Sequence, residues 1–266
     1  MGMDAILEGT VAELTGSVVL ITGGCGDLGL AISARLVRAG AFVCVNDRIP
    51  QEQAAIRLTR VDPSGTQIHY YPADVTDRPA VDAMIEEIVS TRGRLDIAIC
   101  NAGIVESAPF LDVSLDSWQR HIASNLTGVF NTAQAAARSM VAQRVAGRIL
   151  LTGSWVGEVP WLDIAPYSVS KAGVRMLGRS MAKELAPLGI RVNIMSPGIV
   201  GAGMAQRQWD TEPAYRARAS TAIPLGELQQ PASVAEAMLW LCLPASDYMT
   251  GAVLLVDGGA SLFGQE

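Results

Sequence analysis

Short runs of β-branched and other apolar residues recur along the chain, and longer stretches with helical periodicity separate them. Most runs span four or five residues and show little alternation between apolar and polar positions. Such continuous runs are typical of strands buried on both faces of a parallel sheet. They predict strands at Val18–Ile21, Phe42–Val45, Gln67–Tyr71, Ile97–Cys100, Arg148–Leu151, Arg191–Met195 and Val253–Val256.

Two of the intervening stretches show a clear helical face. The first ends at Gly40, and its face carries Leu28, Ala31, Ile32, Arg35, Leu36 and Ala39. The second runs from Tyr167 to Leu185, and its apolar stripe contains Val169, Ala172, Gly173, Met176, Leu177 and Met181. Strands that alternate with helices predict an α/β fold, a doubly wound parallel sheet in a single domain.

We expect this catalytic domain to span residues 14–266, preceded by a short N-terminal extension over residues 1–13. Within the domain, segment 201–227 mixes glycine, proline, tryptophan and arginine without clear periodicity. Long irregular segments in a compact domain are often lids or binding loops. We therefore expect a lid at about 201–227.

Composition and charge narrow the possible partners of the 266-residue chain. Half of the residues are hydrophobic and 17% are charged, as in globular proteins. A net charge of −6 without a Lys/Arg-rich run disfavours nucleic acid. Mean hydropathy is +0.28, but the longest uncharged stretch, Val192–Gln206, contains polar residues, proline and glycine, so we expect no membrane span.

The cysteine and histidine content points to chemistry without metals or disulfides. Cys25, Cys44, Cys100 and Cys242 lie far apart, mostly in apolar runs, which predicts buried free thiols in a reducing compartment such as the cytoplasm. Acidic residues precede the first base at the N-terminus, which argues against a signal peptide. With only two histidines, a zinc site or a Ser-His-Asp triad is poorly supported, and we expect no metal.

A glycine-rich turn, Thr22–Gly29, follows the first strand directly and opens the first helix. Glycines let the backbone turn tightly and leave room for a pyrophosphate at the helix N-terminus, where free N–H groups and the helix dipole favour an anion. The expected contacts are Gly23, Gly26, Asp27, Leu28 and Gly29.

Asp47 ends the second strand. A carboxylate there can accept hydrogen bonds from the adenosine ribose and repel the 2′-phosphate of NADP, which favours NAD. Arg48 could instead accommodate NADP. Further cofactor contacts are expected after the third and fourth strands, at Asp74, Val75, Asn101, Ala102 and Gly103.

Ser154 follows the fifth strand, and Tyr167 and Lys171 share a face of the next helix because they lie four residues apart. A free tyrosine has a pKa near ~10, too high for a base at neutral pH. A nearby ammonium would lower that pKa. We expect Tyr167 to act as acid/base, Lys171 to lower its pKa and Ser154 to hold the substrate oxygen. The alternative is a helix surface without function.

Together with Asn125 and Pro197–Gly198, these motifs resemble the short-chain dehydrogenase/reductase family in its single-domain branch. The resemblance runs from about Leu14 to Gly259, and Tyr167 stands 13 residues after Ser154, as the family pattern requires. It implies a Rossmann-type fold, a nicotinamide cofactor and a homotetramer.

The resemblance also implies roles for individual residues. The implied catalytic tetrad is Asn125, Ser154, Tyr167 and Lys171. Asn125 would hold a water that links Lys171 to a proton relay, and Lys171 would bind the nicotinamide ribose. Pro197 and Gly198 would pass the nicotinamide, and the backbone near Val200 would bind its carboxamide.

Two positions depart from the family pattern. Asp27 stands in the turn where the branch usually has glycine, and an acid beside a pyrophosphate weakens binding unless it faces solvent or caps a helix. Ala202 replaces a threonine that usually touches the carboxamide. We therefore expect modest cofactor affinity.

These features predict an NAD-dependent oxidoreductase that interconverts a secondary alcohol and a ketone. One alternative is a 3-oxoacyl-carrier-protein reductase that uses NAD(P)H, against which Asp47 and the net charge argue. Another is a catalytically silent family member that binds a nucleotide, against which the intact tetrad argues.

Aromatic side chains gather in the segments that this family uses to shape its substrate pocket, at Trp155, Trp161, Trp209 and Tyr215. With Ser154 and Tyr167 as the polar pair, such walls favour a medium-sized, largely apolar alcohol or ketone. Sugars are the main rival, because Asp163, Glu158 and Gln208 could supply hydrogen bonds. The aromatic residues could instead pack the lid or a subunit contact.

Overall fold

A seven-stranded parallel sheet forms the centre of the molecule, in the strand order β3-β2-β1-β4-β5-β6-β7. The computed structural model describes residues 13–262. The strands are β1 (Val18–Thr22), β2 (Phe42–Asp47), β3 (Ile68–Pro72), β4 (Ile97–Cys100), β5 (Arg148–Thr152), β6 (Arg191–Pro197) and β7 (Val253–Val256). Every predicted strand is present to within two residues, which confirms the α/β, doubly wound fold.

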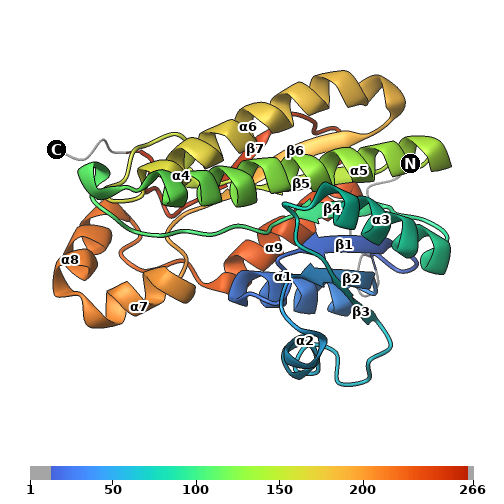
Figure 1. Ribbon diagram of the computed structural model, residues 1–266, viewed down its shortest axis with the longest axis horizontal. Coiled ribbons are helices and arrows are strands. Elements are labelled where there is room, and N and C mark those ends of the chain that lie inside the picture. Colours follow the sequence, from blue (N-terminus) through green and yellow to red (C-terminus); the bar gives the residue numbers. More distant parts are fainter. Residues whose placement is uncertain (1–12, 263–266) are drawn as a thin grey trace, which may run out of the picture.

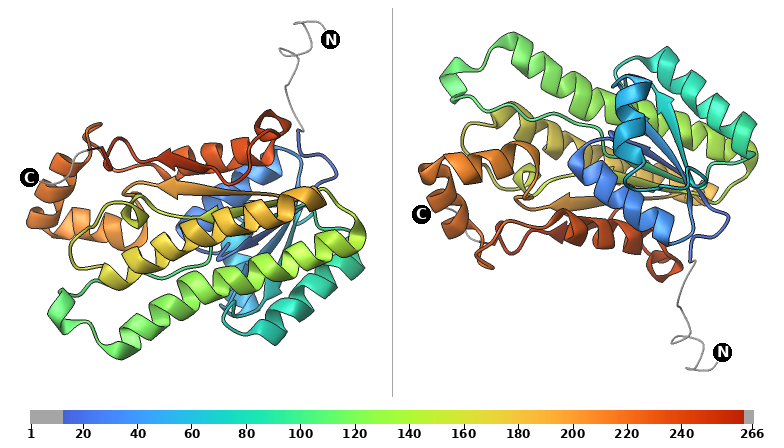
Figure 2. Two further views of the ribbon diagram at one scale, coloured as in Figure 1. Left: turned by 90° about the horizontal axis from the view of Figure 1, so that it is seen from above. Right: turned by 90° about the horizontal axis from the view of Figure 1, so that it is seen from below.

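Helices cover both faces of the sheet (Figures 1 and 2). On one face lie α3 (Arg78–Arg92), α4 (Leu115–Ile122), α5 (Gly128–Gln143) and α6 (Ala165–Leu185). On the other face lie α1 (Asp27–Arg38), α2 (Gln51–Leu58) and α9 (Pro231–Cys242). Each face has its own buried core, because the central strands bury side chains in both directions.

The helix predicted from Tyr167 to Leu185 forms as α6, but its buried face differs from the predicted stripe. Val169 and Met176 are exposed at 47% and 61%. The face against the sheet instead carries Ser170, Lys171, Val174, Gly178 and Ala182. Gly178 allows the closest approach, since a Cβ there would lie 2.7 Å from the Ile194 side chain. Leu177 and Met181 of the predicted stripe are partly buried against the same core. The helix thus turns small and functional residues inward and leaves Val169 and Met176 outside.

The segment predicted as an irregular lid is instead helical. It contains α7 (Gly203–Thr211) and α8 (Pro213–Ala222), which lie beyond the carboxyl ends of the strands (Figure 1). Tyr215 and Ala219 of α8 are buried in a third apolar cluster together with Trp155 and Trp161. The periodicity is weak because each helix is short and buries only a few residues.

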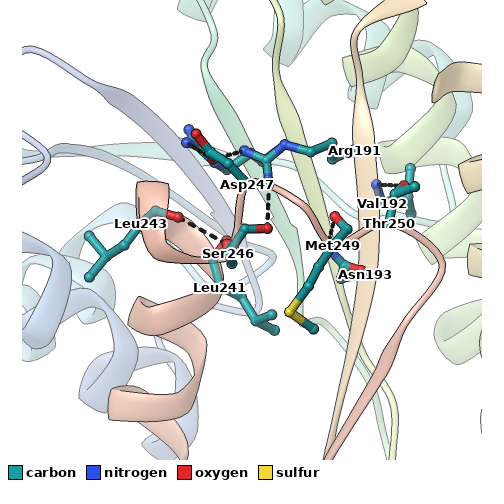
Figure 3. Close-up of polar contacts among 10 residues, drawn as sticks. Arg191, Val192, Asn193, Leu241, Leu243, Ser246, Asp247, Met249 and Thr250 are labelled. Carbon is teal, nitrogen blue, oxygen red and sulfur yellow. Dashed lines mark hydrogen bonds and ion pairs between the residues drawn. The ribbon is translucent and has the colours of Figure 1, made fainter. Parts of the chain in front are cut away.

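The loop after α9 is fixed to β6 by polar contacts (Figure 3). Arg191 donates to the Ser246 carbonyl at 3.1 Å and to the Asp247 carboxylate at 2.5 Å. The Asn193 amide donates to the Met249 carbonyl at 2.9 Å. These bonds hold the connection that leads into β7 at the edge of the sheet.

Several further sequence predictions concern the chain as a whole. All four cysteines are free and buried, as predicted. No helix within residues 13–262 is long and apolar enough to cross a membrane. Nearly all of the expected N-terminal extension, residues 1–12, lies outside the described residues.

The close packing at Gly29 yields a prediction for stability. A Cβ at Gly29 would lie 2.3 Å from the Gly23 carbonyl oxygen and 2.6 Å from the Gly24 Cα, both backbone atoms of the turn. We expect Gly29→Ala to lower the free energy of unfolding by about 3 kcal/mol, which is the upper end of the usual cost of adding atoms to a packed core. The cost is high because backbone atoms, unlike side chains, cannot change rotamer to avoid the new methyl group. Thermal or urea unfolding measures this loss.

Gly26→Ala is the matched control for that substitution. Its Cβ would meet the Gly23 oxygen at 3.6 Å, an ordinary contact. The expected loss is below about 1 kcal/mol, from the poorer N-cap that alanine provides. Equal losses in the two variants would contradict this account of the turn.

Candidate active site

One continuous cavity of about 480 Å³ opens at the carboxyl ends of the strands. Strand order reverses between β1 and β4, and in doubly wound sheets such a switch point leaves a crevice for ligands. The cavity runs from the glycine-rich turn past the ends of β2, β3 and β4 to α6, α7 and α8. All residues expected to be catalytic or to bind the cofactor line it except Asn125.

The glycine-rich turn is held in place by Asn101. Its side-chain amide donates to the carbonyls of Thr22 and Gly23 at 3.1 and 3.3 Å, and its backbone N–H donates to the Thr22 hydroxyl. Gly23 adopts φ +63° and lies so close to Ala102 that a Cβ would be 2.8 Å from the Ala102 Cα. Asn101 and Ala102 therefore shape the turn as well as line the cavity.

The N-terminus of α1 has no side-chain cap, and its first residues line the cavity. An uncapped helix start with glycines around it offers free N–H groups to an anion, which fits the pyrophosphate of a dinucleotide. Asp27 is exposed, and its carboxylate accepts a 3.1 Å hydrogen bond from the Gly203 N–H at the start of α7. The negative charge of Asp27 is thus stabilised by the N-terminus of a second helix, α7.

Asp47 is fixed beside the same turn. Its carboxylate accepts hydrogen bonds from the N–H groups of Cys25 at 3.1 Å and Arg48 at 2.8 Å. The Arg48 guanidinium extends mostly into solvent and approaches Asp74 at 4.0 Å. Asp47 is therefore oriented towards the cavity while Arg48 leans towards the end of β3, where Asp74 and Val75 also line the cavity.

Ser154 and Tyr167 line the same cavity as the glycine-rich turn. Ser154 is buried directly after β5, and Tyr167 belongs to the first turn of α6. Loss of surrounding water raises the pKa of Tyr167 above its ordinary value of about 10, and a hydrogen bond with Ser154 partly opposes that rise. The phenol is consequently protonated at neutral pH.

Lys171 is buried, at 3% exposure, beneath Tyr167. Its Nζ lies 5.5 Å from the centre of the Tyr167 ring and donates a 2.7 Å hydrogen bond to the Thr152 carbonyl. Desolvation lowers the pKa of Lys171 to about 8. The sequence predicted that Lys171 lowers the pKa of Tyr167, but in this structure that pKa is raised, because desolvation outweighs the hydrogen bond with Ser154.

Asn125 is completely buried and does not line the cavity. It lies in a π-helical turn between α4 and α5. Its side chain accepts from the Ile104 N–H at 2.7 Å and donates to the Ile104 carbonyl at 2.9 Å and to the Ser170 hydroxyl at 3.1 Å. Both amide hydrogens of Asn125 are thus hydrogen-bonded within the protein, and the side chain holds the loop after β4 in place.

The end of β6 also borders the cavity. Pro197, Gly198, Val200 and Ala202 line it, as predicted from the sequence. A Cβ at Gly198 would lie 2.7 Å from the Asp257 Cα, so this position requires glycine to pack against the end of β7. The Gln229 side chain accepts from the Gly198 N–H at 3.0 Å and fixes this corner.

Aromatic rings form the wall next to Ser154. Trp155 and Trp161 are 3% and 9% exposed, with ring centroids 5.3 Å apart in an edge arrangement. Tyr215 packs against Trp161 at 6.5 Å. These three residues line the cavity, whereas Trp209 packs in the apolar cluster behind it.

Of the polar groups that could favour a sugar, only one lines the cavity. Gln208 does so from α7. Glu158 is paired with Arg175 at 2.8 Å, and Asp163 does not reach the lining. Sequence reasoning overlooked Arg218, Thr152 and Ile104, which also line the cavity. Only the helical spacing of Arg218 from Tyr215 could have indicated it, once α8 was recognised as a helix.

Metal chemistry has no ligand set in the part of the chain that the structure describes. No group of three or more histidine, cysteine or acidic side chains gathers within residues 13–262. The acidic groups on the cavity wall are Asp27, Asp47 and Asp74, and all three border its glycine-turn end.

Comparison with known proteins supports the assignment suggested by this geometry. The family described as enoyl-(acyl carrier protein) reductase matches residues 26–261. The chain is 35% identical to 3beta-hydroxysteroid dehydrogenase 1 of Eggerthella lenta, over 94% of this chain and 96% of that protein. It is 34% identical to 5-keto-D-gluconate 5-reductase of Escherichia coli K12, over 93% of this chain and 96% of that protein.

Solved structures agree with these sequence matches. A short-chain type dehydrogenase/reductase from Mycobacterium marinum superposes with a TM-score of 0.87 at 37% identity, covering 93% of this chain and 96% of that chain. A gluconate 5-dehydrogenase from Burkholderia cenocepacia, in complex with NADP and tartrate, gives 0.88 at 34% identity, covering 94% and 97%. The chain belongs to the short-chain dehydrogenase/reductase family.

Proposed function

We propose that this protein is an NAD-dependent oxidoreductase that interconverts a secondary alcohol and a ketone, with Tyr167 as the acid/base. The observation that carries the proposal is the single cavity shared by the glycine-rich turn, Asp47, Ser154, Tyr167 and Lys171. The named activities of its relatives, on a hydroxysteroid and on a keto sugar acid, share oxidation or reduction at a carbon that bears oxygen.

In this proposal the nicotinamide, when bound, accepts or gives the hydride. Ser154 holds the substrate oxygen next to Tyr167. In the reducing direction, the protonated phenol donates its proton to that oxygen, which suits the raised pKa of Tyr167. In oxidation, the phenolate takes the proton, and Lys171 below the ring favours that charge.

The cofactor is proposed to be NAD, because the Asp47 carboxylate is fixed at the end of β2, where an acid accepts hydrogen bonds from the adenosine ribose and repels a 2′-phosphate. Two backbone N–H groups orient it, and Arg48 leans away towards Asp74. The relative from Burkholderia cenocepacia is in complex with NADP. Substitutions at Asp47 and Arg48 therefore test the choice between the two cofactors.

The two alternative functions have weaker support. A carrier-protein reductase normally takes NADPH and offers a basic patch to its carrier, and Asp47 and the net charge of −6 argue against both. A silent nucleotide-binding protein does not need a buried ammonium beside a partly buried tyrosine, and burying Lys171 is costly without a use.

We further propose a cytoplasmic homotetramer. Exposed apolar side chains on two separate faces support an assembly with more than one kind of contact. On the α4–α6 face they include Leu115, Trp118, Phe130, Val169 and Met176. Near α9 and β7 they include Trp240, Tyr248 and Leu255.

Replacing Tyr167 with phenylalanine tests the acid/base. The change removes one hydroxyl, so we expect unchanged folding and NAD binding, and a loss of turnover of at least ~10²-fold. NADH formation at saturating secondary alcohol, with calorimetric NAD binding as the control, measures both quantities. A variant with nearly normal turnover would exclude this mechanism.

The pH profile tests the charge state of the same phenol. Because burial raises the pKa of Tyr167, the phenolate fraction grows with pH through the neutral range. We expect kcat/KM for oxidation to rise up to about tenfold per pH unit, while ketone reduction stays nearly flat until deprotonation begins. Oxidation that is independent of pH, measured with both substrates at constant ionic strength, would contradict the assignment.

Asp47 yields a prediction for cofactor choice. The unmodified enzyme should prefer NAD over NADP in kcat/KM by at least about tenfold, because a carboxylate repels the added phosphate. Asp47→Asn keeps the shape of the side chain and removes its charge, so it should reduce the ratio of kcat/KM for NAD to that for NADP. Arg48→Ala is the matched control and should leave NAD kinetics unchanged; a preference for NADP in the unmodified enzyme would refute the role of Asp47.

A further inference from the structure

We propose that Arg218 is an anion-binding residue of the substrate pocket, and that the substrate carries a carboxylate at the end remote from its secondary alcohol or ketone. The inference rests on the proposed function, because it assigns the substrate class of the same cavity. It starts from the position of Arg218 on α8, where its side chain lines the cavity together with Trp161 and Tyr215.

The surroundings of the guanidinium are aromatic. Its Cζ lies 5.0 Å from the centre of the Trp161 ring and 5.7 Å from that of Tyr215. Cation–π contacts of this kind orient a guanidinium and leave its N–H groups without an acceptor. Within residues 13–262, the buried Nε of Arg218 has no hydrogen-bond partner.

Other arginines of this protein satisfy their guanidinium groups differently. Arg191 and Arg148 share the Asp247 carboxylate. Arg216, two residues before Arg218 on the same helix, donates to the carbonyls of Trp209 and Asp210. Arg218 is distinguished by facing a cavity, and the described residues provide it with no carboxylate there. A partly desolvated cation in such a place is stabilised by an anion that enters the cavity.

The charge distribution along the cavity supports a ligand anion at this end. The charged side chains on its wall are Asp27, Asp47, Arg48, Asp74, Lys171 and Arg218. The first four border the cofactor end, and Lys171 lies beneath Tyr167. In the part formed by α7 and α8, Arg218 is the single charged side chain among the described residues.

The aromatic wall defines what separates the two ends of the substrate. Trp155 follows Ser154, its ring packs against Trp161, and Trp161 in turn contacts Arg218. A ligand that reaches both Ser154 and Arg218 therefore passes along apolar rings. This arrangement selects an acid whose carboxylate and reacting carbon are joined by an apolar or aromatic body, rather than a neutral alcohol or a polyol.

Binding of two matched, unreactive probes tests the anion site without turnover. 4-Ethylbenzoate and 4-ethylbenzamide have nearly the same shape and differ in charge. We expect calorimetry on the full chain to show that the benzoate binds at least about tenfold more tightly than the benzamide. The Arg218→Gln variant should lower the affinity for the benzoate by about 10- to 100-fold and change the affinity for the benzamide little.

Two further variants sharpen this comparison. Arg218→Lys keeps the charge without the planar fork and should retain part of the preference. Arg207→Gln removes the same charge from an exposed position on α7, and this variant should keep the full preference for the benzoate over the benzamide. Equal affinity for the two probes, no measurable binding of the acid, or a preference that survives Arg218→Gln would overturn the proposal.

Turnover separates this inference from the proposed function. With NADH and the ketone pair 4-acetylbenzoate and 4-acetylbenzamide, Arg218→Gln should raise KM for the acid about tenfold or more and leave kcat nearly unchanged. If neither ketone is reduced while the binding preference depends on Arg218, the oxidoreductase proposal fails and the anion site stands. If both are reduced equally well and the probes bind equally, the anion site fails and the oxidoreductase proposal stands.

Discussion

Asn101 connects the two halves of the sheet, and its side chain holds the glycine-rich turn that borders the cavity. The strand order reverses between β1 and β4, so the connections leave the sheet in opposite directions and a crevice remains. The carbonyls at the end of β1 would lie open in that crevice, and the Asn101 amide satisfies two of them. Its oxygen in turn accepts from Thr152 at the end of β5. One side chain thereby ties the turn to three strands.

The second constraint is the buried ammonium of Lys171. Burial of a cation is unfavourable, and the Thr152 carbonyl offsets only part of that cost. The lowered pKa of Lys171 and the raised pKa of Tyr167 have the same cause, because both groups have lost water. The low water content around these groups strengthens the attraction between a phenolate and the ammonium. The same loss of water favours the neutral phenol, so Tyr167 stays protonated at neutral pH.

Features encoded by local sequence were predicted well, and those created by tertiary contacts were not. The strands, the glycine-rich turn and the spacing of Ser154, Tyr167 and Lys171 are local patterns, and the structure brings them to one cavity. The buried face of α6 was predicted only in part: Leu177 and Met181 pack against the core, but periodicity assumes that all apolar residues face it. Here the inward face holds Lys171 and small residues, and Val169 and Met176 remain outside.

Asp27 shows why a local reading can misjudge a site residue. Beside a glycine-rich turn, a carboxylate appears only as a repulsive neighbour of a pyrophosphate. Its partner, the Gly203 N–H, lies 176 positions further along the chain, at the start of a helix that the sequence did not predict. The same side chain therefore belongs to the glycine-rich turn and contacts the helix from which Gln208 lines the cavity. A movement of α7 away from the turn breaks that hydrogen bond, so this contact links the position of α7 to the glycine-rich turn across 176 positions of the chain.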